Sequence, residues 1–197
     1  MHVADLSDAA DVAALVHTIV HEIPRVDHLV NCAGVSPEGD LAHTDERALR
    51  QMVELNVTAL TLLTRAAIIR MREAGTGTII NIASAAALQP MPHLAASKSY
   101  VLMLTEALSE ENRGHGLRIF AVSPGDTETQ MNPGPARNKR QPEQVVDTAW
   151  SMLSGKAPSV VDGTMTSILA TLSSRFFPKR LGLRVAEQMM RGKARAA

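Results

Sequence analysis

The side chains that could take part in chemistry follow three short apolar runs. The first run ends in Asn31-Cys32-Ala33-Gly34, the second in Ser84, and the third in Ser123-Pro124-Gly125. Amide and hydroxyl groups beside glycine backbone can hold a polar ligand, and a serine hydroxyl can also act as a nucleophile. No Gly-x-Ser-x-Gly turn surrounds Ser84, which argues against hydrolase chemistry.

A possible metal site at two histidines and a possible reactive cysteine both have simpler interpretations. His17 and His21 have the i, i+4 spacing of metal ligands on a helix, but no third ligand is evident, so we predict exposed histidines and no metal site. Cys32 is the only cysteine, so no disulfide can form within the chain, which fits a reducing compartment. We expect its side chain to be a small buried hydrophobe.

Hydrophobic periodicity predicts the elements that position these residues. Helices are expected over 7–22, 44–74, 95–113 and 143–154. Strands are expected over 26–34, 77–84, 117–125 and 158–163. Ser7 and Thr44 are the predicted N-caps of the first two helices. The stretch 132–142 is too polar and proline-rich for either element.

Strands that alternate with helices predict a single α/β domain over 1–197, with helices on both faces of a doubly wound parallel sheet. Ligands of such sheets bind outside the carboxyl ends of the strands, where the polar and glycine residues gather. Residues 175–197 are expected to form a basic helical tail. Its apolar stripe is broken by Gly182, so packing on the domain is favoured over contact with a membrane.

Composition narrows the classes of partner. Basic and acidic residues balance at 20 each and aromatics make up only 3%, so neither a polyanion-steering field nor a base-stacking surface is expected, and we predict no nucleic-acid partner. The N-terminus has no apolar segment of the secretory kind, and no run of 18 apolar residues occurs. A cytoplasmic location is therefore expected.

Six segments in order resemble the short-chain dehydrogenase/reductase family over nearly the whole chain. They are ADLSD at 4–8, LVNCAG at 29–34, ELNV at 54–57, GTIINIASAAA at 77–87, ASK at 96–98 and SPGDTET at 123–129. The resemblance implies a Rossmann-like sheet and NAD or NADP as cofactor. It also implies hydride transfer between the nicotinamide and a carbonyl or alcohol group of a small-molecule substrate.

The same resemblance assigns site residues. Ser84, Lys98 and Asn56 would be catalytic: Ser84 would bond the substrate oxygen, Lys98 would hold the ribose and lower the pKa of a tyrosine, and Asn56 would hold a water. The cofactor contacts would be Asp5, Leu6, Asn31, Ala33, Gly34, Lys98, Pro124, Gly125 and Thr129. Asp5 and Leu6 would face the adenine, and Thr129 the nicotinamide carboxamide.

Two departures from the family pattern bear on activity. The chain contains no Gly-x-x-x-Gly-x-Gly turn, so the resemblance implies an N-terminal truncation of about 50 residues, the first βαβ unit, with loss of the main phosphate contact. Leu94 stands four residues before Lys98, where the family has its catalytic tyrosine. The segment PMPHLAASK looks shortened, so that the tyrosine falls in a gap. Tyr100 would point about 200° away from Lys98 on a helix, and His93 is the nearby candidate for a replacement acid.

Two functions stay open on this evidence. One is an NAD(P)-dependent oxidoreductase whose given sequence is incomplete, and the other is a non-catalytic relative that binds a ligand or a partner subunit. The helices expected over 44–74 and 95–113 carry apolar residues on more than one face, which predicts a homodimer or homotetramer. Neither the substrate nor the preference for NAD or NADP can be inferred from these residues.

Overall fold

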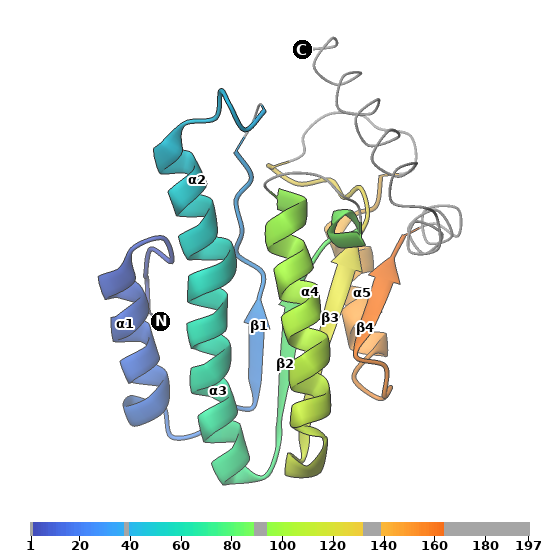
Figure 1. The fold of residues 1–197 in the computed structure, drawn as a ribbon. Helices are drawn as coiled ribbons and strands as arrows, with labels where there is room; N and C mark the ends of the chain where they lie inside the picture. The colour runs from blue at the N-terminus through green and yellow to red at the C-terminus, as the bar shows by residue number, and fades with distance from the viewer. Residues whose placement is uncertain (1, 38–39, 89–93, 132–138, 164–197) are drawn as a thin grey trace.

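The computed structural model describes residues 2–37, 40–88, 94–131 and 139–163, and four parallel strands form its sheet (Figure 1). The strands are β1 (His28–Asn31), β2 (Gly77–Ile82), β3 (Leu117–Pro124) and β4 (Ser159–Asp162), in the spatial order β1-β2-β3-β4. Every neighbouring pair is parallel, so all carboxyl ends meet at one edge. The predicted α/β parallel sheet is confirmed. The predicted tail over 175–197 lies outside the described residues.

Helices cover both faces of the sheet, with α1, α3 and α4 on one face and α5 on the other (Figure 1). The α-helices are α1 (Ala9–His17), α2 (Glu46–Val53), α3 (Leu60–Ala74), α4 (Leu94–Glu111) and α5 (Pro142–Ser151). Short helical turns are η1 (Thr18–Glu22), η2 (Glu54–Ala59), η3 (Ala85–Leu88) and η4 (Arg113–His115). The doubly wound arrangement follows from the alternation of side chains along the strands.

Strand β3 shows that alternation most clearly. Ala121 packs with Val101 of α4, whereas its neighbours Phe120 and Val122 pack on the opposite side with Val145 of α5. The three β3 residues are fully buried, because each face of the strand meets a helix.

The two predicted N-caps are wrong by one residue each. Asp8 caps α1, and its carboxylate accepts hydrogen bonds from the amides of Ala10 and Asp11, while Ser7 bonds Asp5 instead. Asp45, not Thr44, caps α2. A carboxylate satisfies the same free amides as a hydroxyl and adds a favourable interaction with the helix dipole.

The helix predicted over 44–74 runs from Glu46 to Ala74, with a π-helical turn, η2, in its middle. Gly75 ends it with a φ of 68°, a left-handed conformation that glycine adopts without strain. By length and composition alone this segment could cross a membrane, yet half of its most apolar window is buried in the domain. That burial is what a core helix shows.

A buried polar network fixes the carboxyl end of β1. Asn31 donates to the side-chain oxygens of Asn81 at 2.8 Å and Thr64 at 3.0 Å, and Asn81 donates to Thr105 at 2.9 Å. Asn31 and Asn81 are also paired in the register of β1 and β2. The network joins both strands to α3 and α4 beneath the edge where ligands bind in such sheets.

Candidate active site

Lys98 lies in the second turn of α4 and reaches the carboxyl end of β2. Its Nζ donates to the carbonyl oxygen of Ile82 at 2.7 Å, and only 8% of the residue is exposed. Burial lowers the pKa of the Lys98 ammonium, and interaction with nearby Cys32 partly opposes this. Ile82 is the one hydrogen-bond partner of Nζ among the described residues, so two of its three N–H groups are available to a ligand.

Asn56 lies in the π turn η2 and is 1% exposed. Its Oδ1 accepts from the amide of Val35 at 2.9 Å, and its Nδ2 donates to the carbonyl oxygen of Val35 at 2.9 Å and to Oγ of Ser97 at 3.0 Å. The side chain of Asn56 thereby links the segment after β1 to α4 by hydrogen bonds. A π turn at such a position is common in functional sites.

Gly34 is the point where these two side chains meet. A Cβ added to residue 34 would lie 3.2 Å from Oδ1 of Asn56 and 3.4 Å from Nζ of Lys98. The predicted residues Gly34, Asn56 and Lys98 are therefore brought together. Because residue 34 has no side chain, its backbone can lie this close to the amide of Asn56 and the ammonium of Lys98.

Ser84 lies two residues after the end of β2 and is half-buried. Its Oγ accepts from the amide of Ala86 at 3.1 Å, so its own proton has no partner within the described part of the chain. It stands two residues after Ile82, whose carbonyl holds Lys98, so both groups belong to the carboxyl end of β2. Ser99 of α4 donates to the carbonyl of Ala87 and fixes this turn against the helix.

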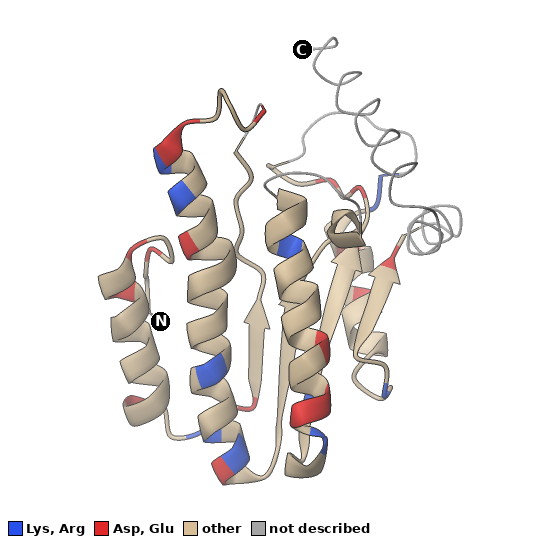
Figure 2. Ribbon diagram, viewed as in Figure 1, with Lys and Arg blue, Asp and Glu red and all other residues tan. Residues whose placement is uncertain are grey.

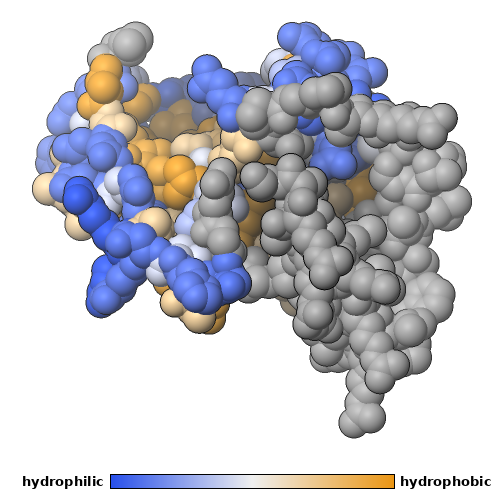
Figure 3. All heavy atoms as spheres, turned by 90° about the horizontal axis from the view of Figure 1, so that it is seen from above, coloured by the Kyte–Doolittle hydropathy of each residue, from blue (hydrophilic) through white to orange (hydrophobic). Residues whose placement is uncertain are grey.

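The segment after β3 adjoins the same end of the sheet. The amide of Ala83 donates to Val122 at 2.8 Å, and the amide of Gly125 donates to Asp162 at 2.9 Å, so Pro124 and Gly125 lie between the ends of β2 and β4. Thr129 is exposed further along this segment. Viewed onto this edge, apolar atoms lie recessed behind a hydrophilic rim (Figure 3).

The residues at the end of β1 divide into two kinds. Asn31 turns its side chain into the buried network, whereas Ala33 and Cys32 are exposed. The prediction that Cys32 is buried was wrong, because the chain leaves the sheet immediately after Asn31. The roles of Asn31 and Ala33 toward a cofactor stay predictions.

Asp5 and Leu6 lie beside α1. Asp5 accepts hydrogen bonds from the amide and hydroxyl of Ser7, and these bonds lower the pKa of its carboxyl group. Leu6 packs against the cluster of Ile19 and Leu63. Their predicted contact with an adenine ring stays a prediction.

The position of the expected tyrosine is the first residue of α4. Leu94 is half-buried there, and its carbonyl accepts from Oγ of Ser97 at 2.9 Å. Tyr100, the only tyrosine of the chain, lies 2.9 Å from Oγ1 of Thr61 on α3, so no phenol accompanies Lys98. His93 lies outside the described residues.

Two further contacts of the site were not predicted from the sequence. Ser97 joins Asn56 to the start of α4 across 41 positions of the chain. Arg140 and Asp162, whose side chains form an ion pair at 2.8 Å, hold the segment after β3. The acidic residue Asp162 directly after a β-branched run was the one hint of the second contact that the sequence offers.

Comparison with known proteins gives a consistent result. The family model described as short chain dehydrogenase matches residues 1–140. An uncharacterized oxidoreductase of Thermotoga maritima is 30% identical over 148 residues, which cover 74% of this chain and 59% of that protein. The inactive 2-(S)-hydroxypropyl-CoM dehydrogenase 2 of Xanthobacter autotrophicus is 31% identical, with 84% of each chain covered.

Among solved structures, a short-chain dehydrogenase from Sphingobium yanoikuyae in complex with NADPH superposes with a TM-score of 0.76 at 26% identity, covering 92% of this chain and 73% of that one. The chain thus spans less than two thirds of the Thermotoga protein that it matches. The family match over most of its length agrees with the convergence of Gly34, Asn56 and Lys98. This chain belongs to the short-chain dehydrogenase family.

Proposed function

We propose that this chain binds a nicotinamide dinucleotide, NAD or NADP, across the carboxyl edge of its sheet and catalyses slow hydride transfer to or from a small carbonyl or alcohol compound. The observation that carries the proposal is the meeting of Lys98, Asn56 and Gly34 at this edge. Ser84 stands on the same strand end. The Sphingobium relative, a complex with NADPH, supports the choice of cofactor class.

The residues present fit the nicotinamide, its ribose and the adenine of such a cofactor. Lys98 offers two N–H groups next to the backbone of Gly34, and an ammonium is a suitable donor to a pair of ribose hydroxyls. The half-buried hydroxyl of Ser84 donates its proton to no described residue, which leaves that proton for a substrate oxygen. Pro124, Gly125 and Thr129 would adjoin the nicotinamide, and Asp5 and Leu6 the adenine.

Each residue then has a definite task. When bound, the nicotinamide supplies or accepts the hydride. Ser84 would donate to the substrate oxygen where negative charge develops, and Lys98 would fix the ribose and keep positive charge close by. Asn56 would hold the backbone of Val35 and the start of α4 in place around the ammonium.

The missing tyrosine sets the expected rate. A general acid commonly contributes about 10²–10⁴-fold to such a reaction. With Leu94 at the start of α4, no side chain of that kind stands beside Lys98 among the described residues. Turnover by this chain would accordingly be slow, with water delivering the proton.

A second candidate is a non-catalytic relative that binds the nucleotide or a partner subunit. The same residue, Leu94, favours it. So does the similarity to the Xanthobacter protein, which is named as inactive. In this case the dinucleotide would be a ligand and not a reactant.

Assembly with a second copy is part of both candidates. Leu62 of α3 and Met103 of α4 are 41% and 63% exposed, and the hydrogen bond between Thr61 and Tyr100 places the two helices side by side. Figure 2 shows the upper part of α3 and the middle of α4 without charged residues. Such a face favours a homodimer, in which both helices would pack against their copies.

The variant Leu94→Tyr decides between the two candidates. Residue 94 is one helical turn before Lys98, so its side chain shares a face with the lysine. We expect Leu94→Tyr to accelerate oxidation of NADPH by a panel of aldehydes and ketones by about 10²-fold or more. Leu94→Phe, which adds the ring without the hydroxyl, should leave the rate unchanged. Equal rates for both variants, with nucleotide binding intact, would favour the non-catalytic relative.

A further inference from the structure

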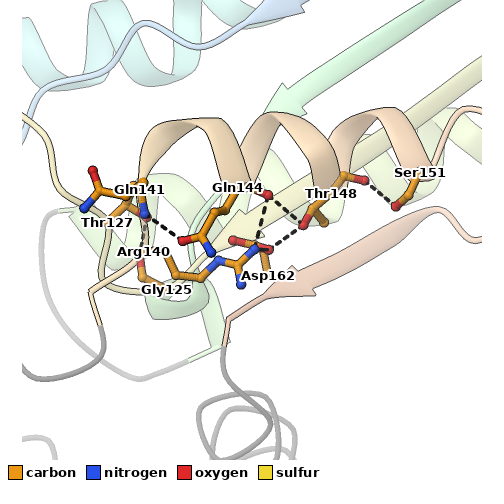
Figure 4. Close-up of polar contacts among 8 residues, drawn as sticks. All are labelled: Gly125, Thr127, Arg140, Gln141, Gln144, Thr148, Ser151 and Asp162. Atoms are coloured by element: carbon orange, nitrogen blue, oxygen red, sulfur yellow. Dashed lines mark hydrogen bonds and ion pairs between the residues drawn. The ribbon is translucent and has the colours of Figure 1, made fainter.

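A second polar cluster lies between β4 and α5, apart from Lys98. Asp162, the last residue of β4, is 3% exposed, and its Oδ1 lies 2.8 Å from Nη2 of Arg140 (Figure 4). Thr148 of α5 donates to the same oxygen at 2.5 Å. Arg140 also donates to the carbonyl of Gln144 at 3.2 Å. The guanidinium therefore joins the end of the sheet to the first turn of α5.

The backbone of Arg140 is bound to the segment after β3. Its amide donates to the carbonyl oxygen of Asp126 at 2.9 Å, and its carbonyl oxygen accepts from the amide of Glu128 at 2.9 Å. These two bonds pair Arg140 with Thr127 in a parallel β-bridge. The neighbouring residue adds a salt bridge, 3.0 Å long, between Lys139 and Glu128. Residues 126–128 and 139–140 are thus joined by both backbone and side-chain contacts.

Asp162 holds the other end of the same segment. Its carbonyl oxygen accepts from the amide of Gly125 at 2.9 Å, and a Cβ on residue 125 would lie 3.4 Å from that oxygen. One aspartate therefore binds Gly125 through its backbone and Arg140 through its carboxylate. Residues 125–128 and residues 139–140 are therefore both tied to the end of β4.

We propose that Arg140, Asp162 and Thr148 are positioning residues, which hold residues 125–129 at the carboxyl edge and thereby shape the nicotinamide half of the cofactor site. We call the contacts of Arg140, Asp162 and Thr148 with residues 125–129 the clamp. The identity of its ligand rests on the proposed function, but the existence of the clamp does not. A buried carboxylate is tolerated when it is paired, and removal of its partner leaves an uncompensated charge. When Arg140 is lost, water enters to solvate the carboxylate of Asp162. Residues 126–128, which Arg140 bound through its backbone, are then released.

A purely structural role would produce a different pattern. If the ion pair served only to pack α5 on β4, its loss would lower stability without a selective effect on residues 125–129. Binding of NADH and of ADP-ribose distinguishes a clamp from a purely structural role, because ADP-ribose shares the adenine half of NADH and lacks the nicotinamide. A clamp on the nicotinamide side affects NADH and leaves ADP-ribose nearly unchanged.

The test combines amide hydrogen exchange with nucleotide titration on the full chain. Arg140→Gln should accelerate exchange at the Gly125 and Glu128 amides at least tenfold without nucleotide. It should also raise the Kd of NADH roughly tenfold and that of ADP-ribose less than about twofold. Arg140→Lys should restore part of both effects. Arg50→Gln, which breaks the exposed pair with Glu46 on α2, is the matched control and should change neither.

Thr148→Val keeps the shape of the side chain and removes one bond to Asp162, so it serves if Arg140→Gln does not fold. Unchanged exchange at Gly125 and Glu128 in these variants overturns the clamp. An equal rise of both Kd values also overturns it. If the unaltered chain binds neither nucleotide, the proposed function fails, and exchange at the two amides alone decides on the clamp.

Discussion

The ammonium of Lys98 donates to the carbonyl oxygen of Ile82 at 2.7 Å, and no carboxylate among the described residues forms a salt bridge with it. A charged side chain is thus held below the surface by a single neutral acceptor. Such a group is costly unless a ligand or a change of protonation compensates it. The burial of Lys98 is therefore expected to affect both the free energy of unfolding and the affinity for a nucleotide.

Stability should depend on pH through Lys98. Burial lowers the pKa of its ammonium below 10.5 in the folded chain, so the unfolded chain binds more protons in the window below 10.5. The free energy of unfolding contributed by this group therefore rises with pH across that window. Lys98→Met should remove this rise, measured by urea unfolding from pH 7 to 10 in a Cys32→Ser background. Lys156→Met, at an exposed site, is the control, and identical pH slopes in all three proteins would contradict the burial.

Gly34→Ala should weaken nucleotide binding more than it lowers the stability of the fold. The added methyl group would stand 3.2 Å from Oδ1 of Asn56, so neighbours must shift by a few tenths of an ångström. We expect a loss of about 1 kcal/mol in the free energy of unfolding and at least tenfold weaker binding of NADH. Gly114→Ala, where an added Cβ meets nothing within 4 Å, should leave binding unchanged. Wild-type affinity in Gly34→Ala would show that NADH does not bind beside Gly34 and Lys98.

Asn81→Ala should destabilise the whole domain. Asn81 is fully buried, and its loss leaves Thr105 without a donor and removes one of the two acceptors of Asn31. An unsatisfied buried polar group costs about 1–3 kcal/mol, and chemical denaturation measures the change directly. A change below about 0.5 kcal/mol would mean that water replaces the network.

Met103→Glu should dissociate the proposed dimer. Met103 is 63% exposed on α4, and a charge buried in an isologous contact would appear twice. Sedimentation velocity should show a dimer for the unaltered chain and a monomer for the variant. Met131→Glu, at an exposed position outside both helices, is the matched control. A monomeric unaltered chain would contradict the assembly.

The sheet could be predicted because its signals are local. Alternating helices and β-branched runs indicate a parallel sheet, and parallel strands bring Gly34, Ser84 and Gly125 to one edge whatever the details of packing. α5 begins at Pro142, within one residue of the predicted helix, whereas residues 132–138 of the predicted loop lie outside the described residues. These predictions depend on short stretches of sequence.

Other features depend on contacts that no short stretch contains. The π turn at Asn56 has no distinctive local composition, since it is stabilised by contacts of the side chain with Val35 and Ser97. The ion pair of Arg140 joins a polar loop to a strand end 22 positions later. Cys32 was expected to be buried because it follows an apolar run, but the strand ends one residue before it. Long-range packing decided each of these cases.

The most direct test of the proposed site is titration of the purified chain with NADH and NADPH, followed by fluorescence of the nicotinamide. The unaltered chain should bind at least one of the two, and Lys98→Met should bind it at least tenfold more weakly while it remains folded. A folded chain that binds neither nucleotide, or that binds equally well without Lys98, would contradict the nicotinamide site at the carboxyl edge.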